Sequence, residues 1–139
     1  MSIENGLIIC GILGFLISLY FTLVYYGLMK PSQWFIPPIC RMDEGTCQTI
    51  IHTSDAKILG APNFVLGLSY YITVIAYASV PFLQQTIILH RFLLAISFAT
   101  IILGVYLSYS LLFKLRTTCV LCFSSHVLNL IIVMLLFFR

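Results

Sequence analysis

The chain has 139 residues, of which 61% are hydrophobic and only 8% are charged. Soluble domains carry about a quarter of charged residues, so these few charged side chains cannot cover the surface of a soluble globular protein. Disordered chains are polar and rich in charge, which excludes disorder as well. The net charge of +3 comes from 7 basic and 4 acidic residues scattered along the chain, so it does not indicate nucleic-acid binding.

Four long apolar segments decide the fold class. A helix that crosses a membrane needs about 20 predominantly apolar residues, and four uncharged segments meet this need, at about residues 6–29, 64–83, 92–113 and 118–138. The amino end holds Glu4 and neither Lys nor Arg, unlike a cleavable signal, so we expect the first helix to remain in the mature protein. The sequence predicts an all-α integral membrane protein, one domain over residues 1–139, folded as an up-down-up-down bundle of four transmembrane helices.

One large loop, at about residues 30–62, joins the first two spans and carries Cys40 and Cys47. Apolar positions within residues 46–59 indicate a half-helix that caps the bundle. Short connections at residues 84–91 and 114–117 join the remaining spans. In an up-down bundle the large loop and the 114–117 connection lie on the same side of the membrane, so four of the five cysteines gather there.

Two of these cysteines, Cys119 and Cys122, form a C-x-x-C motif at the start of the fourth span. Three residues make nearly one helical turn, so both thiols face the same way. The amino end of a helix stabilises negative charge and therefore favours the thiolate, which is the reactive form of a redox dithiol. Cys40 and Cys47 lie in a loop that can bend toward this pair, an arrangement that suits the transfer of a disulfide by thiol–disulfide exchange.

Two other interpretations of the cysteines stay open at this point. The four could form two structural disulfides in a non-catalytic four-helix membrane protein, such as an accessory subunit of a channel or receptor. They could also bind zinc, but the spacing of Cys40 and Cys47 is too wide for a zinc knuckle, and we predict no metal. Cys10 lies within the first span and is expected to act as a small apolar side chain.

Polar residues continue the stripe of the C-x-x-C motif down the fourth span, where His126 and Asn129 follow Cys122. Polar groups at membrane depth are costly and usually face a cavity or a partner. His126 is either a residue that packs between helices with its hydrogen bonds made inside the protein, or a hydrogen-bond donor to the carbonyl of a ligand. Asn63 is an ordinary N-cap of the second helix, a second such donor, or both. No G-x-G-x-x-G motif for NAD or flavin is present. A quinone needs only apolar walls, two donors and a nearby thiolate, all of which this sequence offers.

These residues resemble the vitamin K epoxide reductase family over nearly the whole chain. The resemblance rests on three motifs, which are Cys40-x6-Cys47, Gly60-Ala-Pro-Asn-Phe-Val-Leu-Gly67 and Cys119-Val-Leu-Cys122-Phe-Ser-Ser-His126-Val-Leu-Asn129. It implies a four-helix bundle around a quinone such as vitamin K, menaquinone or ubiquinone. It also implies that Cys119 and Cys122 are the catalytic pair, with Cys122 nearer the quinone, and that Cys47 of the Cys40–Cys47 shuttle pair exchanges with Cys119.

The resemblance further implies that Asn63 binds the quinone and that a thioredoxin-like dithiol protein is the partner. There are departures. His126 stands where vertebrate members have a Tyr, and the shuttle spacing is one residue shorter, so reduction of a quinone is a safer expectation than reduction of the epoxide. Thr53 falls where the family often has a Ser, and Ser54 is adjacent.

The expected function is therefore that of a membrane thiol–quinone oxidoreductase that supports disulfide-bond formation, in a bacterial inner membrane or the endoplasmic reticulum membrane. Disulfide chemistry places the cysteine side in the periplasm or lumen. The distribution of Lys and Arg disagrees, because the expected outer side holds five of them and the inner side two, Arg91 and Arg139. We give the redox argument more weight, since the outer loop also carries three acidic residues.

Overall fold

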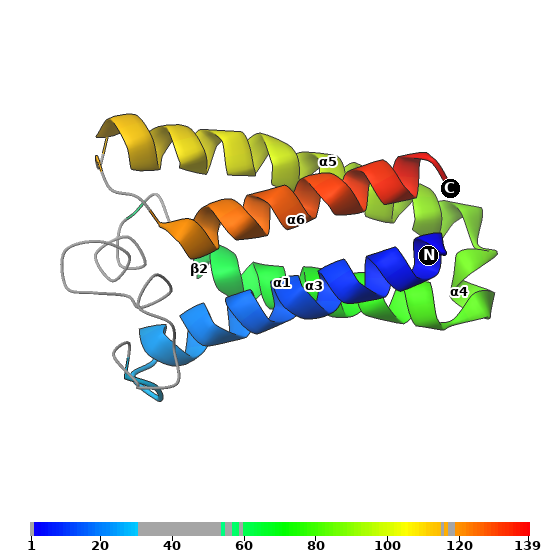
Figure 1. Cartoon of the computed structure of the whole chain (residues 1–139), viewed down its shortest axis with the longest axis horizontal. Helices are drawn as coiled ribbons and strands as arrows, with labels where there is room; N and C mark the ends of the chain where they lie inside the picture. The colour runs from blue at the N-terminus through cyan, green and yellow to red at the C-terminus, as the bar shows by residue number, and fades with distance from the viewer. Residues whose placement is uncertain (1, 31–53, 55–56, 59, 115, 117–118) are drawn as a thin grey trace.

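The computed structural model describes residues 2–30, 54, 57–58, 60–114, 116 and 119–139. Most of them are helical, and the long helices run side by side (Figure 1). The elements in chain order are α1 (Ile3–Tyr25), β1 (Lys57–Ile58), β2 (Ala61–Pro62), α3 (Asn63–Ser79), α4 (Pro81–Gln84), α5 (Ile87–Tyr109), a π-helical turn η3 (Ser110–Lys114) and α6 (Val120–Phe137).

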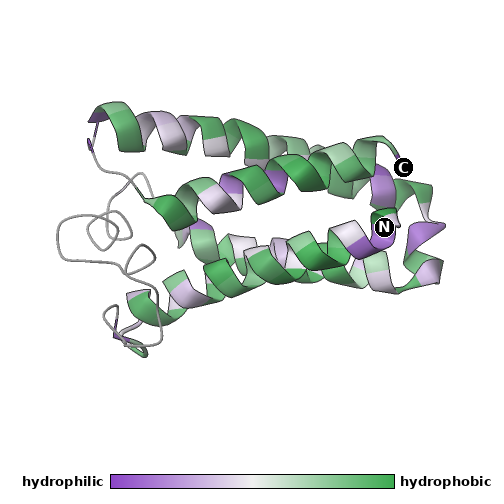
Figure 2. Cartoon of the chain, viewed as in Figure 1, coloured by the Kyte–Doolittle hydropathy of each residue, from purple (hydrophilic) through white to green (hydrophobic). Residues whose placement is uncertain are grey.

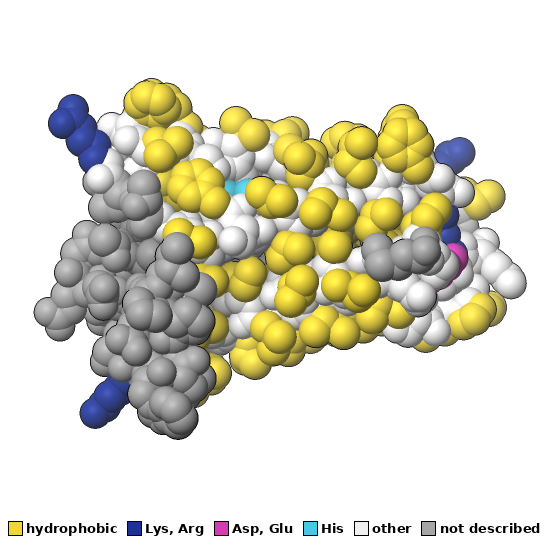
Figure 3. All heavy atoms as spheres, viewed as in Figure 1, with side chains coloured by type: hydrophobic (Ala, Val, Ile, Leu, Met, Phe, Trp, Pro, Cys, Tyr) yellow, Lys and Arg dark blue, Asp and Glu magenta, His cyan; other side chains and the backbone are white. Residues whose placement is uncertain are grey.

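Among the described residues, three helical segments are long and apolar enough to cross a membrane: Ile3–Tyr25, Ile87–Lys114 and Val120–Phe137. Helix α3 is apolar but shorter, at 17 residues. Hydrophobic residues cover the helices along their length, and the charged side chains visible on this face lie at the two ends (Figures 2 and 3). This distribution is that of a helical membrane protein, because apolar side chains on the outer face of a bundle are stable against lipid.

The second predicted span differs from the structure at its end. We expected it to continue to about residue 83, but α3 ends at Ser79 and Pro81 starts the separate four-residue helix α4. Proline has no backbone N–H and fits the first turn of a new helix better than the interior of a continuing one. The turn predicted at 84–91 therefore lies earlier in the chain: it contains α4 and ends before α5, which begins at Ile87.

The approach to α3 is a short antiparallel hairpin, which an all-α prediction did not include. Ile58 of β1 pairs with Ala61 of β2, and Gly60 has a φ of +84°, a backbone conformation that glycine adopts without a steric penalty. The half-helix expected within residues 46–59 falls mostly outside the described residues.

Small residues let α1 pack closely on α3. A Cβ atom added to Gly11 would lie 2.7 Å from Ile75, and one added to Gly14 would overlap the ring of Tyr71. Helices in a membrane associate through such close packing, because the hydrophobic effect contributes little between surfaces that already face lipid. Helix α1 also packs on α6, and α6 packs on α5.

Helices α3 and α5 are joined by long tyrosine side chains. The hydroxyls of Tyr70 and Ser97 are hydrogen-bonded at 2.9 Å, and the Tyr77 hydroxyl meets Nδ1 of His90 at 2.8 Å. Each bond satisfies polar groups that would otherwise be costly at this depth.

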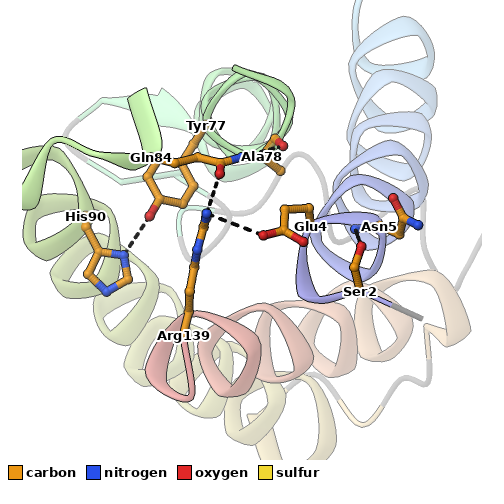
Figure 4. A network of polar contacts seen from close by, with 8 residues as sticks. All are labelled: Ser2, Glu4, Asn5, Tyr77, Ala78, Gln84, His90 and Arg139. Carbon is orange, nitrogen blue, oxygen red and sulfur yellow. Dashed lines mark hydrogen bonds and ion pairs between the residues drawn. The ribbon is translucent and has the colours of Figure 1, made fainter. Parts of the chain in front are cut away.

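The end of the bundle that holds both termini is closed by a polar network (Figures 1 and 4). Arg139 lies at its centre, hydrogen-bonded to the side-chain oxygen of Gln84 and 3.5 Å from a carboxylate oxygen of Glu4. Its guanidinium also lies over the ring of Tyr77, 5.1 Å from the ring centre. The network therefore links the start of α1, the end of α3, α4 and Arg139, two residues after the end of α6.

Candidate dithiol site at the amino end of α6

The C-x-x-C motif lies at the end of the bundle opposite the termini, where α6 begins. Cys119 is the N-cap of α6 in an extended conformation, and Cys122 lies in the first turn. The Cys122 thiol donates to Sγ of Cys119, and the two sulfur atoms are 2.7 Å apart. A disulfide bond is about 2.0 Å long, so a small movement of either side chain would allow the bond to form.

The two cysteines differ in their exposure. Cys119 has no exposed surface and packs in a cluster with Phe21 and Val24 of α1, whereas Cys122 is half-buried at the edge of the same cluster. Phe64 of α3 also borders the cluster, and its ring is stacked on Phe21 with centroids 6.1 Å apart. The pair therefore lies against apolar walls, and Cys122 is the more accessible of its two members.

His126 follows one helical turn deeper and interrupts the apolar surface of α6, which carries a short hydrophilic stretch (Figure 2). Its ring packs against Gly104 of α5, where an added Cβ would lie 2.8 Å from Nδ1. Nδ1 is buried and has no hydrogen-bond partner among the described residues. A buried N–H without an acceptor is rarer than a buried acceptor without a donor, so the neutral ring with its proton on Nε2 is the favoured form.

Asn129 lies one further turn along and bonds across the bundle. Its side-chain oxygen accepts a hydrogen bond of 2.7 Å from the hydroxyl of Tyr71 in α3. The sequence predicted that Asn129 shares a helix face with Cys122 and His126, but it did not predict that Tyr71 bonds to Asn129. The available signal was Gly14, whose missing side chain leaves room for the large Tyr71 ring between α1 and α3.

Asn63 is the first residue of α3 and is half-buried at the same end of the bundle as the cysteines. The interpretation of Asn63 as the N-cap is wrong, because Pro62 occupies that position and the helix start has no side-chain cap bond. The neighbouring Phe64 contacts the cysteine cluster, so Asn63 lies near the site, with its amide unbonded among the described residues.

The structure thus brings Cys119 and Cys122 together, places His126 below them, and puts Asn63 at the same end. Cys40, Cys47 and Thr53 lie outside the described residues, and Ser54 is exposed. Cys10 is buried in the main core among Tyr71 and other apolar residues. Among the described residues, no three His, Cys, Asp or Glu side chains are grouped as a metal site requires.

The sequence of the chain matches the model of a known protein family. The model of the vitamin K epoxide reductase family matches residues 6–137, which include both cysteine pairs, Asn63 and His126. No curated protein matches the chain. Because the match covers nearly all of its 139 residues, the chain belongs to the vitamin K epoxide reductase family.

Proposed function

We propose that this protein is a membrane thiol–quinone oxidoreductase that passes electrons from a partner dithiol through Cys40 and Cys47 to Cys119 and Cys122, and on to a quinone. Family membership supports a membrane quinone-linked oxidoreductase in general. The observation that carries the finer proposal is the pair of sulfur atoms 2.7 Å apart at the start of α6, beside apolar walls and one turn above His126.

The proposed reaction is a relay of one disulfide. A thioredoxin-like partner reduces the Cys40–Cys47 disulfide and becomes oxidised. The Cys47 thiolate then attacks Sγ of Cys119 in the Cys119–Cys122 disulfide, and Cys122 leaves as a thiolate. Attack of Cys40 on Cys47 restores the shuttle disulfide and leaves Cys119 and Cys122 as a dithiol. This dithiol closes to a disulfide as two electrons and two protons pass to the quinone, which becomes a quinol.

The residues around the pair suit this chemistry. In this proposal the Nε2–H of His126 and the amide of Asn63 donate to quinone carbonyls, on which negative charge develops during reduction. Quinone reduction, of vitamin K, menaquinone or ubiquinone, is preferred to epoxide reduction because His126 replaces the Tyr of vertebrate members.

In the membrane we propose four crossings with up-down-up-down topology. Helix α3 spans about 26 Å at 1.5 Å per residue, slightly less than the roughly 30 Å hydrocarbon core, and the apolar residues of α4 extend it. We propose that the cysteine end faces the periplasm or lumen, where the partner protein would find an oxidising environment.

The test is reduction of a panel of quinones, and of vitamin K epoxide, by dithiothreitol in the presence of the purified full-length protein in lipid nanodiscs. We expect protein-dependent quinol formation that is lost in Cys119→Ala and Cys122→Ala. The Cys10→Ala variant is the matched control, because Cys10 lies in the core away from the dithiol, and it should keep its activity. Absence of quinol formation with every quinone would contradict the proposal.

A further inference from the structure

Asn129 has a hydrogen-bonding capacity that the described part of the protein does not use. Its side chain is half-buried, and the Tyr71 hydroxyl is its hydrogen-bond partner within that part. Because the amide oxygen of Asn129 accepts from Tyr71, the amide nitrogen points away from that hydroxyl, and its two N–H groups have no acceptor among the described residues. Open donors at membrane depth are costly, so their retention at this position favours a role in binding a ligand that carries an acceptor.

Tyr71 is closely packed on its own side of the hydrogen bond. It is only 2% exposed, and its ring fills the space that the missing side chain of Gly14 leaves between α1 and α3. Ser18 of α1 packs beside the ring at Gly67, since a Cβ added to Gly67 would lie 2.8 Å from the Ser18 hydroxyl oxygen. This packing holds the Tyr71 hydroxyl in place, and the hydrogen bond of 2.7 Å in turn orients the Asn129 amide.

The place of this amide relates it to the dithiol. Tyr71 reaches Asn129 from α3, and Gly104 of α5 meets His126, so the shared face of α6 points into the bundle between these helices. His126 and Asn129 are three residues apart, about 4.5 Å along the helix axis. The two side chains therefore lie at successive depths of the bundle, so they can meet the two carbonyl groups of one quinone ring at different depths.

We propose that Asn129 is a further quinone-binding residue, donating from its amide to the ring carbonyl that lies deeper in the membrane, and that Tyr71 positions this amide. The inference rests on the proposed function and extends it. His126 and Asn63 serve the carbonyl nearer Cys122, and Asn129 serves the other. Tyr71 does not touch the quinone in this arrangement and acts through Asn129.

The test compares Asn129→Leu, Tyr71→Phe and their combination in full-length protein. The control is Tyr70→Phe, because Tyr70 is the neighbouring buried tyrosine and also loses one interhelical hydrogen bond, to Ser97. With dithiothreitol in excess, we expect Asn129→Leu to raise the quinone KM about tenfold, the scale of one hydrogen bond, and Tyr71→Phe to raise it several-fold. Because both act on one contact, the double variant should be no worse than Asn129→Leu.

A spectroscopic readout separates this role from a loss of packing. Hydrogen bonding lowers the stretching frequency of a carbonyl, so bound quinone labelled with ¹³C at its carbonyls should show two lowered infrared bands in the wild-type protein. One band should rise in Asn129→Leu and broaden or rise partly in Tyr71→Phe, while Tyr70→Phe leaves both unchanged.

The outcomes distinguish this inference from the proposed function. Normal quinone turnover, with KM and carbonyl bands unchanged in Asn129→Leu and Tyr71→Phe, overturns the role of Asn129 and leaves the proposed function intact. Equal changes in Tyr71→Phe and Tyr70→Phe overturn the positioning role of Tyr71. A wild-type protein that neither binds nor reduces a quinone overturns the proposed function, and this inference with it.

Discussion

Replacing Gly104 by Ala tests whether the placement of the His126 ring matters for quinone reduction. The added Cβ would lie 2.8 Å from Nδ1 and 3.2 Å from Cγ of His126. Atoms in ordinary contact are about 3.5–4.0 Å apart, so the ring has to move by roughly 0.5–1 Å. A misplacement of about 1 Å at a reacting centre can cost on the order of a hundredfold in rate, so we expect kcat/KM for the quinone to fall about tenfold to a hundredfold.

The assay is quinol formation with dithiothreitol by the purified variant in lipid nanodiscs. Gly6→Ala is the matched control, because its Cβ would lie 3.0 Å from the flexible end of Leu135, close to the opposite end of the bundle, and it should leave kcat/KM unchanged. In a His126→Ala background the Gly104→Ala change should have no further effect, since the ring it displaces is gone. Wild-type kcat/KM in Gly104→Ala would refute the reasoning.

Three further predictions concern the cysteines and His126. His126→Phe should raise the quinone KM or lower kcat about tenfold to a hundredfold, the effect of losing one hydrogen bond worth roughly 1.5–3 kcal/mol. His126→Tyr should keep much of the activity. Wild-type kinetics in the Phe variant would show that His126 is only a packing residue. Cys122→Ala should accumulate a Cys47–Cys119 disulfide, visible by non-reducing peptide mass spectrometry, and its absence would argue against the relay. In intact cells, an impermeant maleimide should label Cys40 and Cys47 after mild reduction; labelling only after permeabilisation would reverse the orientation.

The helices could be predicted from the sequence because their signal is long and local. An uncharged run such as that at about residues 6–29 has one stable form in lipid, a helix, although α1 ends earlier than predicted, at Tyr25. The C-x-x-C spacing brings Cys119, the N-cap, and Cys122, in the first turn, together at the start of α6. The break at Pro81 was also readable in principle, but the apolar residues on both sides of it hid the change of helix. Apolar periodicity reports burial, and it does not report where one apolar helix stops and the next begins.

The contacts between helices could not be predicted in the same way. Nothing local in the sequence pairs Tyr71 with Asn129, which lie 58 residues apart, or Gly104 with His126. Such pairs depend on the rotation of each helix about its axis, which small residues such as Gly14 set through close packing. The N-cap interpretation of Asn63 was wrong for a related reason, because the hairpin before α3 moves the cap to Pro62.

Polar groups within the bundle fall into two classes, and their distribution is the strongest structural argument for a binding site. Toward the end with the termini they are paired, as Tyr77 is with His90 and Arg139 is with Gln84 and Glu4. On the face of α6 below the dithiol, Nδ1 of His126 and the amide nitrogen of Asn129 have no hydrogen-bond partner among the described residues. Packing alone would favour apolar side chains there, because unpaired polar groups destabilise a membrane helix. Their position beside two close thiols supports the proposed site for a carbonyl-bearing electron acceptor.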